Sequence, residues 1–518
     1  MISHNDKSTF DHKQAHADAL SALRKESLDI YNRLHSIQED IGFVNRVHHH
    51  YPAFPILPNL RCGAWYTDPA FASETPAYFK STDGHTGNWG FNLRRANLHL
   101  LPLISQKSGI VLVDSTRAGK RMPDALSKTV PIWCAVVNRA ISFRRQRHEL
   151  EPISSSKWDR QLYTPPGVVS AQEHHQIAIM LDGWAKALAD SSFELPLDLP
   201  APLRPFWITP STTTFPVLDA NTQSPAFFPI ICVSASKQVE TGTERRIGGF
   251  AYVQGSGDDH ELWGMGLTPQ IFWKYRVELL ASPRASLEDL IRQILSSSST
   301  SYAPSQTDVN FLRSRFSPTP IRKTDGRIQL ASFSPTDLNA LLSSLRSDVS
   351  EGVNAAYIIL DFSLSPSNLE VNPLEPSVLK GCPPSQNTLH ILASPKGKAK
   401  PDTHFLQHIL PTAIPFIKIH LLSDSPQNIY ILEGRGYDSG TRLDMSVGLG
   451  VVAIQLYFDQ NGTLMKEGQK VQADKQSIRT RLEWIIESVP RANPSRATLK
   501  RVNEYLLTPS TYLSRPGS

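Results

Sequence analysis

Residues 109–124 of the chain are GIVLVDSTRAGKRMPD. Gly109 to Val113 is a short apolar run rich in β-branched residues, which is typical of a buried strand. Polar residues follow it, and Pro123 suits the first turn of a helix. In such a strand–loop–helix unit, backbone N–H groups at the helix start face the loop and attract anions. The stretch therefore predicts an α/β fold with a phosphate site between the strand and the helix.

The loop of this unit is rich in groups that bind phosphate. Its hydroxyls, its glycine and its three cations are Ser115, Thr116, Arg117, Gly119, Lys120 and Arg121. Two flanking carboxylates, Asp114 and Asp124, are candidate ligands for a metal ion. The loop is not a Walker A motif, because it lacks G-x-x-x-x-G-K-[ST]. It also differs from the acidic pair and T-G-x-T loop of ordinary phosphoribosyltransferases.

A second polar segment, YFKSTDGHT, occupies residues 78–86. It contains the turn dipeptide Asp83-Gly84, so we expect it to form a loop. Its candidate anion-binding residues are Lys80, Ser81, Thr82 and His85. Asp83 is a candidate metal ligand; the alternative for the whole segment is an ordinary polar surface turn. Arg94 and Arg95 follow next to aromatic residues, a pattern that suits RNA contact.

A third segment, GSGDDHE, occupies residues 255–261. Its glycines predict a loop in which Asp258 and Asp259 converge on one cation or on a hydroxyl group that loses its proton. The alternative, a charged loop tip, is equally consistent with the sequence.

The C-terminal part repeats the strand–loop–helix pattern. Residues 429–432 are the apolar IYIL, residues 433–448 are a glycine-rich loop, and residues 449–458 are apolar again. This order predicts a second phosphate cradle, with Arg442 and Ser446 as its candidate contacts. No cysteine follows Cys382, so a cysteine-phosphatase mechanism is excluded for this part.

At 518 residues the chain is long enough for two or three domains. Residues 381–402 combine prolines, glycines and lysines, and we interpret them as a linker between a large first part, 1–380, and a smaller domain, 403–518. Helical spacing of apolar residues predicts an amphipathic helix over 14–44. A second helix is expected after Ser170, which forms a capping box with Glu173.

Composition places the chain among ordinary globular proteins, with 40% hydrophobic and 19% charged residues. No apolar run approaches the length of a membrane span, and the N-terminus lacks a secretory apolar region, so we expect a cytoplasmic protein. The four cysteines are scattered and indicate neither a zinc site nor a disulfide framework. A net charge of +5 is only mildly basic. Basic clusters offer candidate RNA contacts, with a solvated surface as the alternative: Arg144, Arg145, Lys500 and Arg501.

Six strings, in order along most of the chain, resemble the initiator-tRNA phosphoribosyl transferase family, the tRNA 2′-O-ribosylphosphate transferases of fungi and plants. They are RCGAWY at 61–66, YFKSTDGH at 78–85, LRRANLHL at 93–100, DSTR with GKRMPDALSK at 114–128, PIWC at 131–134 and GSGDDH at 255–260. Strings of this length are far more specific than a short motif.

The resemblance implies transfer of a phosphoribosyl group from phosphoribosyl pyrophosphate, with Mg²⁺, to a ribose 2′-hydroxyl in the T-stem of initiator methionine tRNA. The mark would exclude this tRNA from elongation. The candidate catalytic residues are then Asp83, Asp114 and Asp258, and the candidate metal ligands are Asp83, Asp114, Asp124 and Asp259. The family also implies a C-terminal domain similar to dual-specificity phosphatases, a central sheet flanked by helices. Here its loop lacks the cysteine that relatives carry.

Two other functions remain open from the residues. One is a phosphatase-like hydrolase of RNA or phosphoinositide, and the other is a tRNA-binding protein without catalysis. No feature of the sequence indicates an obligate protein partner.

Overall fold

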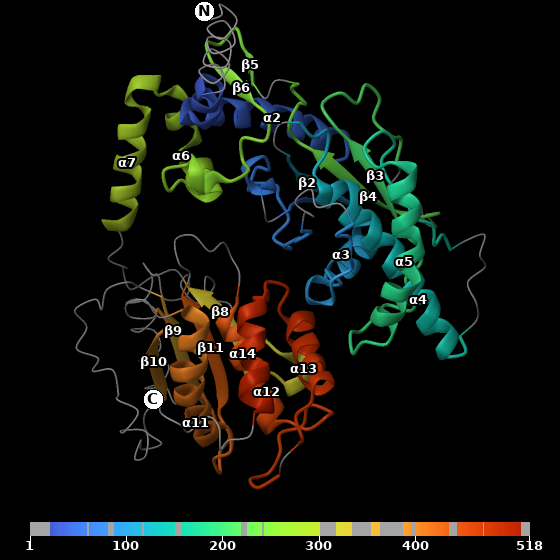
Figure 1. The fold of residues 1–518 in the computed structure, drawn as a ribbon, viewed down its shortest axis with the longest axis vertical. Coiled ribbons are helices and arrows are strands. Elements are labelled where there is room, and N and C mark those ends of the chain that lie inside the picture. The colour runs from blue at the N-terminus through green and yellow to red at the C-terminus, as the bar shows by residue number, and fades with distance from the viewer. Residues whose placement is uncertain are drawn as a thin grey trace, which may run out of the picture. The chain divides into compact units, whose positions relative to one another are not determined.

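The structure is a computed structural model, and it describes most of the chain. The described residues are 21–59, 62–80, 87–116, 119–150, 158–218, 225–240, 243–300, 318–333, 354–362, 387–394, 400–434, 443–469 and 471–508. The chain divides into two compact units (Figure 1). The first comprises Met1–Asn92, Ala96–Asp190 and Leu195–Thr300, and the second comprises Leu93–Arg95, Ser191–Glu194 and Ser301–Ser518.

The first unit is built on a parallel sheet of four strands, as far as the structure describes it, in the order β1-β2-β4-β3. Its strands are β1 (Ile56–Pro58), β2 (Ile110–Asp114), β3 (Leu203–Ile208) and β4 (Phe228–Ser234). A separate antiparallel pair consists of β5 (Thr243–Arg245) and β6 (Ala251–Val253). Every residue of β2 and β4 is buried, as expected for the centre of a parallel sheet.

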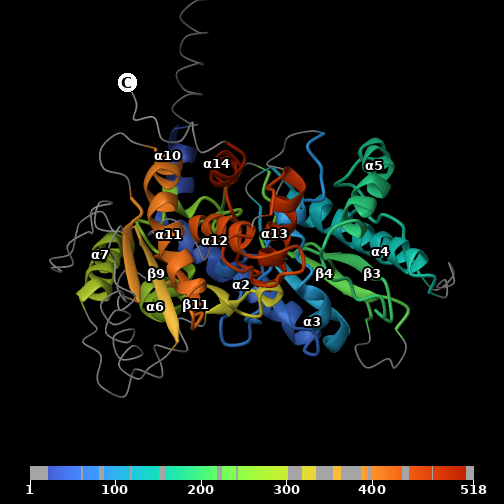
Figure 2. The ribbon, with the colours of Figure 1, turned by 90° about the horizontal axis from the view of Figure 1, so that it is seen from below.

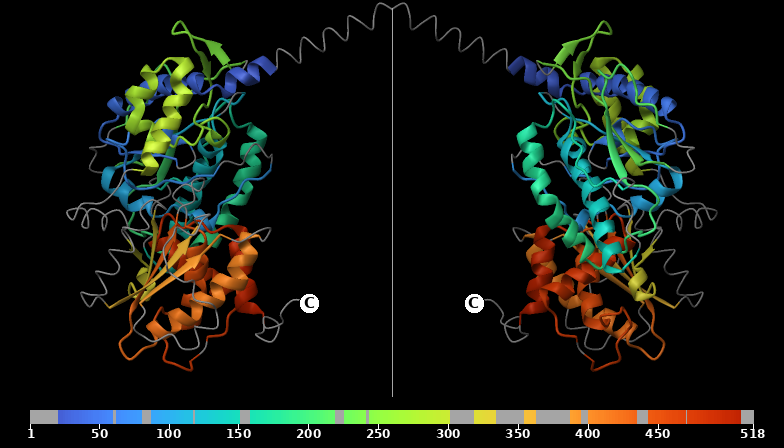
Figure 3. Two further views of the ribbon diagram at one scale, coloured as in Figure 1. Left: turned by 90° about the vertical axis from the view of Figure 1, so that its left-hand side faces the viewer. Right: turned by 90° about the vertical axis from the view of Figure 1, so that its right-hand side faces the viewer.

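Helices cover both faces of this sheet. They are α2 (Ile30–His50), α3 (Leu100–Lys107), α4 (Val130–Arg147), α5 (Ala171–Ala189), α6 (Pro269–Ala281) and α7 (Arg284–Thr300). Short turns of 3-10 or π helix are η1 (Gly63–Trp65), η2 (Leu93–Arg95), η3 (Ala125–Thr129) and η4 (His260–Leu262). Helices α4 and α5 run side by side (Figure 3), and α4 packs on β3.

The core follows the alternation of side chains along the strands. Val111, Val113 and Val233 pack with α2, α6 and α7 in one apolar cluster. Cys232, on the other face of β4, lies within electrostatic reach of Cys134 from α4. The central strands are therefore sandwiched between two helical layers.

The second unit has a five-stranded sheet, counted over its described residues, in the order β10-β9-β11-β8-β7 (Figure 1). Its strands are β7 (Thr319–Pro320), β8 (Ile328–Phe333), β9 (Ala355–Asp361), β10 (Thr388–Leu392) and β11 (Asn428–Gly434). All pairings are parallel except that of β7 with β8.

The helices of this unit are α10 (Pro401–His404), α11 (Leu410–Leu421), α12 (Met445–Tyr457), α13 (Lys475–Ser488) and α14 (Arg496–Leu507). Short helical segments η6 (Arg322–Thr324) and η9 (Phe405–Ile409) complete it. Helix α12 packs on β8 and β11, and α13 and α14 lie beside it (Figure 2). It is an almost wholly buried helix at the centre of the unit.

The predicted boundary between domains differs from this division. Residues 381–402 include β10, and β7, β8 and β9 also precede the expected start at 403. The prolines and lysines around β10 are typical of a linker, so the composition of this stretch did not predict a strand. In the structure β10 is an edge strand whose five residues alternate between half-buried and buried positions.

The predicted elements of the first unit are largely confirmed. Strand β2 and the helix after Pro123 lie as expected, and Ser170 Oγ accepts the backbone N–H of Glu173 at 3.1 Å to cap α5. The helix expected over 14–44 is interrupted at Asp29, which caps a separate helix, α2, that continues to His50. Residues 14–20 lie outside the described residues.

Candidate active site

The carboxyl ends of three parallel strands bring polar side chains together in the first unit. Asn59 follows β1, Asp114 ends β2, and Ser234 ends β4 opposite Asp114 in the register. Ligands of open α/β sheets bind at this edge, because the loops that leave it converge there.

Asp114 is the buried centre of this cluster, with 1% of its surface exposed. Its Oδ2 accepts Nδ2 of Asn59 at 2.7 Å. Its Oδ1 accepts the thiol of Cys62 and the backbone N–H of Ser115, both at 2.8 Å. Burial raises the pKa of Asp114 to about 6, while these hydrogen bonds oppose the rise. The carboxyl group is thus set to change charge close to neutral pH.

Asp258 lies within electrostatic reach of Asp114, because its charge also raises the pKa of Asp114. Its loop is held firmly. The backbone O of Asp258 accepts Nε1 of Trp263 at 3.1 Å, and Arg33 Nη1 donates to Ser256 O at 3.1 Å. Asp259 is an exposed neighbour with a left-handed backbone, φ 46°. The loop is therefore a fixed acidic rim, with Asp258 as its buried member.

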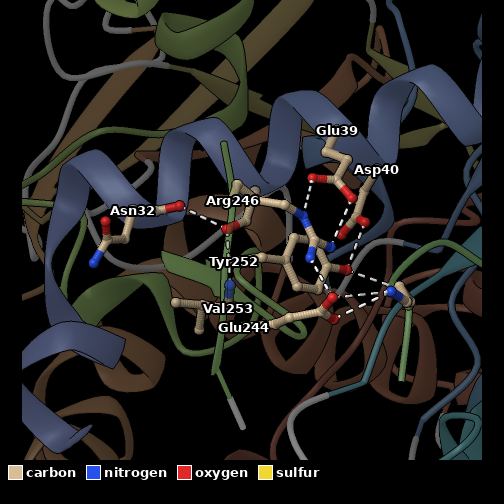
Figure 4. Close-up of polar contacts among 9 residues, drawn as sticks. Asn32, Glu39, Asp40, Glu244, Arg246, Tyr252 and Val253 are labelled. Atoms are coloured by element: carbon tan, nitrogen blue, oxygen red, sulfur yellow. Dashed lines mark hydrogen bonds and ion pairs between the residues drawn. The ribbon is translucent and has the colours of Figure 1, made fainter. Parts of the chain in front are cut away.

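Hydroxyl groups connect the cluster to Asp40 of α2, and Figure 4 shows the contact of Asp40 with Tyr252. Ser115 Oγ and Ser236 Oγ are 2.6 Å apart, and Ser236 donates to Asp40 Oδ2 at 2.6 Å. Tyr252 donates its phenolic proton to Asp40 Oδ1 at 2.7 Å. Burial raises the pKa of Asp40 well above its usual range, and the hydrogen bonds from Ser236 and Tyr252 oppose that rise.

The segment that starts at Tyr78 is attached to the same cluster. Asn59 Nδ2 donates to Phe79 O at 2.9 Å, and Phe79 N donates to Asn59 Oδ1 at 2.8 Å. The backbone O of Lys80 accepts Oγ1 of Thr129 at 2.8 Å, beside the start of α4. Two segments that the sequence singled out thus meet near Asp114. Ser81, Thr82, Asp83 and His85 lie outside the described residues.

The loop after β2 leads to a helix start that carries alternating charges. Lys120 Nζ is 3.0 Å from Asp124 Oδ2, and Lys128 Nζ is 3.5 Å from Asp124 Oδ1 and 2.7 Å from Glu173 Oε1. Arg121 is exposed. Because Asp124 is shared by two ammonium groups, its described contacts are those of an ion-pair partner rather than of a metal ligand.

Gly119 and Thr116 complete the described part of this loop. Gly119 has a left-handed φ of 85°, which suits a glycine, and no atom lies within 4 Å of the place where a Cβ would stand. Thr116 is buried. Arg117 lies outside the described residues.

A divalent cation fits this edge of the sheet by its chemistry. Mg²⁺ in phosphate sites is usually held by one or two carboxylates plus substrate phosphates. Asp114 keeps acceptor capacity beyond its three donors, and Asp258 lies nearby. The buried Oγ of Ser234 has no partner among the described residues, and a ligand or a water would satisfy it. No group of three or more His, Cys, Asp or Glu with metal-binding geometry occurs in the described part of the chain.

The second predicted cradle is filled by the chain itself. Glu433 at the end of β11 is buried, and its Oε2 accepts the backbone N–H of Ser446 at 2.9 Å and of Asp444 at 3.1 Å at the start of α12. The hydroxyl of Ser446 also donates to Oε2. Ser446 therefore donates to the Glu433 carboxyl group, which occupies the position where phosphate binding was expected. Arg442 lies outside the described residues.

The arginines of α4 have contacts within the fold. Arg144 Nη2 donates to Ala189 O at 2.9 Å, at the end of α5, and Arg145 Nη1 donates to Leu197 O at 2.5 Å. Cations suit this end of a helix. RNA contact by Arg144 and Arg145 stays a prediction, and these side chains have a structural role.

The remaining candidate RNA contacts lie in the second unit. Arg95 Nε donates to Asn493 Oδ1 at 2.8 Å. Burial lowers the pKa of Arg94, and the charge of Arg496 adds to this effect. Arg501 forms ion pairs with Asp402 and Glu504, whereas Lys500 is exposed.

Sequence reasoning missed several members of the cluster. They are Asp40, Asn59, Cys62, Tyr66, Ser236 and Tyr252. Asn59 and Ser236 follow strands β1 and β4, and the rule for carboxyl ends of parallel strands could have found them. Nothing in the sequence separates Asp40 from an exposed acidic residue of an amphipathic helix.

Among the described residues no helix is both long and apolar enough to cross a membrane. The three cysteines in that part of the chain, Cys62, Cys134 and Cys232, are buried and free.

Comparison with known proteins gives matches for both units. The family model described as the Rit1 N-terminal domain matches residues 23–296, and the one described as the Rit1 DUSP-like domain matches residues 390–506. An uncharacterised Schizosaccharomyces pombe protein, C3F10.06c, is 34% identical over 505 residues, which are 95% of this chain and 98% of that protein. The tRNA A64-2′-O-ribosylphosphate transferase of Saccharomyces cerevisiae is 38% identical over 290 residues, which are 52% of this chain and 54% of that enzyme.

Proposed function

This chain belongs to the Rit1 family, and we propose that it transfers a phosphoribosyl group to the ribose 2′-hydroxyl of adenosine 64 in initiator methionine tRNA. The proposed donor is phosphoribosyl pyrophosphate, bound with Mg²⁺. The product would carry a bulky anionic group in the T-stem, which keeps this tRNA out of translation elongation. A cytoplasmic location belongs to the same proposal.

The buried cluster at the carboxyl end of β2 is the observation that carries the proposal. Asp114 ends β2, and the loop that follows it carries the hydroxyl of Thr116 and leads to a helix start. This order supplies a carboxylate, hydrogen-bond donors and a positive dipole end within one loop, which is what a phosphorylated sugar donor and its metal ion require.

The proposed chemistry follows from the charges that develop. Loss of pyrophosphate leaves positive charge on the sugar ring and negative charge on the leaving group. Lys120 and Arg121 would supply countercharge to the leaving group, and Mg²⁺ would neutralise part of the same charge. Asp114 or Asp258 would accept the proton of the 2′-hydroxyl, and a pKa of about 6 at Asp114 suits a base that works near neutral pH.

Label transfer tests the proposal. Phosphoribosyl pyrophosphate labelled in its 5-phosphate is incubated with the protein, Mg²⁺ and initiator methionine tRNA. Elongator methionine tRNA and an initiator tRNA with 2′-deoxyadenosine at position 64 are the controls. We expect label on the unmodified initiator tRNA alone.

Three other outcomes would contradict the proposal in different ways. Label on the 2′-deoxy substrate would show that the acceptor is another group. Release of inorganic phosphate without label on tRNA would favour a hydrolase. Tight tRNA binding without label would favour a binding protein.

A further inference from the structure

Asp40 accepts hydrogen bonds from side-chain hydroxyl groups, whereas Asn32 and Ser36 on the same helix accept hydrogen bonds from backbone N–H groups. Asn32, Ser36 and Asp40 lie one turn apart on α2 and are all buried. Asn32 Oδ1 accepts the backbone N–H of Ala251 at 3.1 Å, and Ser36 Oγ accepts that of Val253 at 2.9 Å, so these two side chains satisfy the edge of β6. Asp40, one turn further along α2, accepts hydrogen bonds from the side-chain hydroxyl groups of Ser236 and Tyr252 instead.

The hydrogen bonds of Asp40 connect it to the loop that follows β2. Ser236 Oγ donates to Asp40 Oδ2 at 2.6 Å, and the same oxygen is 2.6 Å from Ser115 Oγ. Tyr252 donates to Asp40 Oδ1 and is itself held by the backbone N–H of Lys237 at 2.8 Å. The hydroxyl of Ser115 is therefore joined to Asp40 through one intervening side chain, Ser236.

These contacts change the role expected for Ser115. Its hydroxyl is held between Ser236 and Tyr66, inside the fold. Ser115 is the first residue of the loop, and these contacts anchor it. Its backbone N–H also donates to Asp114 Oδ1 at 2.8 Å. Tyr66 secures the other side, because its hydroxyl contacts Ser115 and accepts the backbone N–H of Gly257 at 2.7 Å.

We propose that Asp40 is a positioning residue for the donor: through Ser236 it fixes Ser115, and with it the start of the phosphate loop that follows β2. Anchoring the first residue of a loop that binds a diphosphate lowers the entropy that binding must remove. This inference rests on the proposed function, since it assumes that the loop binds the pyrophosphate end of the donor.

The test compares Asp40→Asn, Ser236→Ala and the double variant with the wild type. Steady-state transfer gives KM for the donor and for tRNA separately, and calorimetry measures binding of phosphoribosyl pyrophosphate and of inorganic pyrophosphate without catalysis. We expect a loss of donor affinity of about tenfold in each single variant, with KM for tRNA unchanged. The double variant should be no worse than the single ones, because both changes break one line of hydrogen bonds.

Glu39→Gln is the matched control. Glu39 is the sequence neighbour of Asp40 and undergoes the same change from carboxyl to amide, but its side chain is 40% exposed and pairs with Arg246 at the surface. Thermal unfolding shows which variants are folded. If Asp40→Asn does not fold, Ser236→Ala, which removes only a hydroxyl group, decides on donor affinity alone.

The outcomes separate the two proposals. A wild type that transfers label while Asp40→Asn and Ser236→Ala keep wild-type donor affinity overturns only the inference. Equal losses for donor and tRNA, or additive effects in the double variant, also overturn it. A wild type that neither transfers nor binds the donor overturns both.

Discussion

At the scale of single residues, Asp114 is placed between opposing influences. It is buried, which favours the neutral acid, and it accepts hydrogen bonds from Asn59, Cys62 and Ser115, which favour the carboxylate. Burial is the larger influence, and the pKa lies at about 6 rather than at the usual 3.8. The carboxylate form therefore accumulates as pH rises through about 6, and the transfer rate should rise with it.

Replacement of Asp114 by Asn tests this assignment. Asp114→Asn keeps the shape but removes the charge and the basic oxygen, and we expect transfer to fall about a hundredfold or more while tRNA binding persists. The measurement is single-turnover label transfer with filter binding of tRNA. Asp182→Asn is the control, because Asp182 on α5 is exposed and forms an ion pair with Arg139 on α4. Activity of Asp114→Asn near the wild-type level would exclude a role in the reaction.

The buried cysteines allow a second prediction at this scale. Burial raises the pKa of Cys62 well above its usual range, and the charges of Asp114 and Asp258 add to the rise; burial also raises the pKa of Cys134 and of Cys232. Because the thiolate is the reactive form, none of the three should react with a thiol reagent at neutral pH. In a Cys382→Ser background we expect no thiol to be titrated until denaturant is added. Rapid labelling of one thiol in the native protein would contradict its buried position.

The sequence predicts Asp83, Asp114 and Asp258 as catalytic residues, but not what surrounds them. A strand followed by Asp-Ser-Thr has a local signature, and so does a glycine-flanked acidic pair. The network of Asp40, Ser236 and Tyr252 has none, because its members are brought together by tertiary packing. Asp40 occupies a polar position of an amphipathic helix, and it is buried by tertiary contacts, among them those of α2 with β6 and of Asp40 with Ser236.

At the scale of elements, β11 and α12 form the strand–loop–helix unit that the apolar runs predict. What the sequence did not indicate is the occupant of the helix start. Glu433 places a carboxylate against the N–H groups of Asp444 and Ser446, where the helix dipole favours negative charge. Burial nevertheless raises the pKa of Glu433 from the usual 4.5 to about 7.

This pKa makes the stability of the second unit depend on pH. The folded chain keeps a proton on Glu433 that the unfolded chain releases, so the contribution to stability is complete below about 4.5 and is lost as pH rises through about 7. Glu433→Gln cannot ionise. We expect the free energy of unfolding of the wild type to fall relative to that of Glu433→Gln by ~3 kcal/mol across this window.

Urea unfolding of both proteins at several pH values between these limits measures the difference. Glu467→Gln is the control, because Glu467 is exposed in its ion pair with Lys418. Parallel stability curves for the wild type and Glu433→Gln would show that Glu433 has an ordinary pKa.

At the scale of the whole molecule, the chain consists of two units with separate sheets. The boundary between them is the feature that the sequence indicated least clearly. The composition of residues 381–402 resembles a linker, yet β10 lies within it. Composition reports on local solvation, whereas membership of a sheet depends on pairing partners far along the chain. The strands that flank β11 are β9 and β8, about seventy and one hundred residues earlier.

Fragments that begin at different residues test where the second unit starts. A fragment 403–518 retains β11 but lacks β7 to β10, so both edges of β11 lose their hydrogen-bonding partners. A fragment 318–518 retains all five described strands of the sheet. We expect 318–518 to give a dispersed amide spectrum and a cooperative thermal transition, and 403–518 to give neither, because an unpaired central strand leaves its backbone N–H and C=O groups unsatisfied against α12. A cooperative transition in 403–518 would instead mean that α11 to α14 form a core without the sheet, and the boundary predicted from composition would then describe the folding unit better than the sheet does.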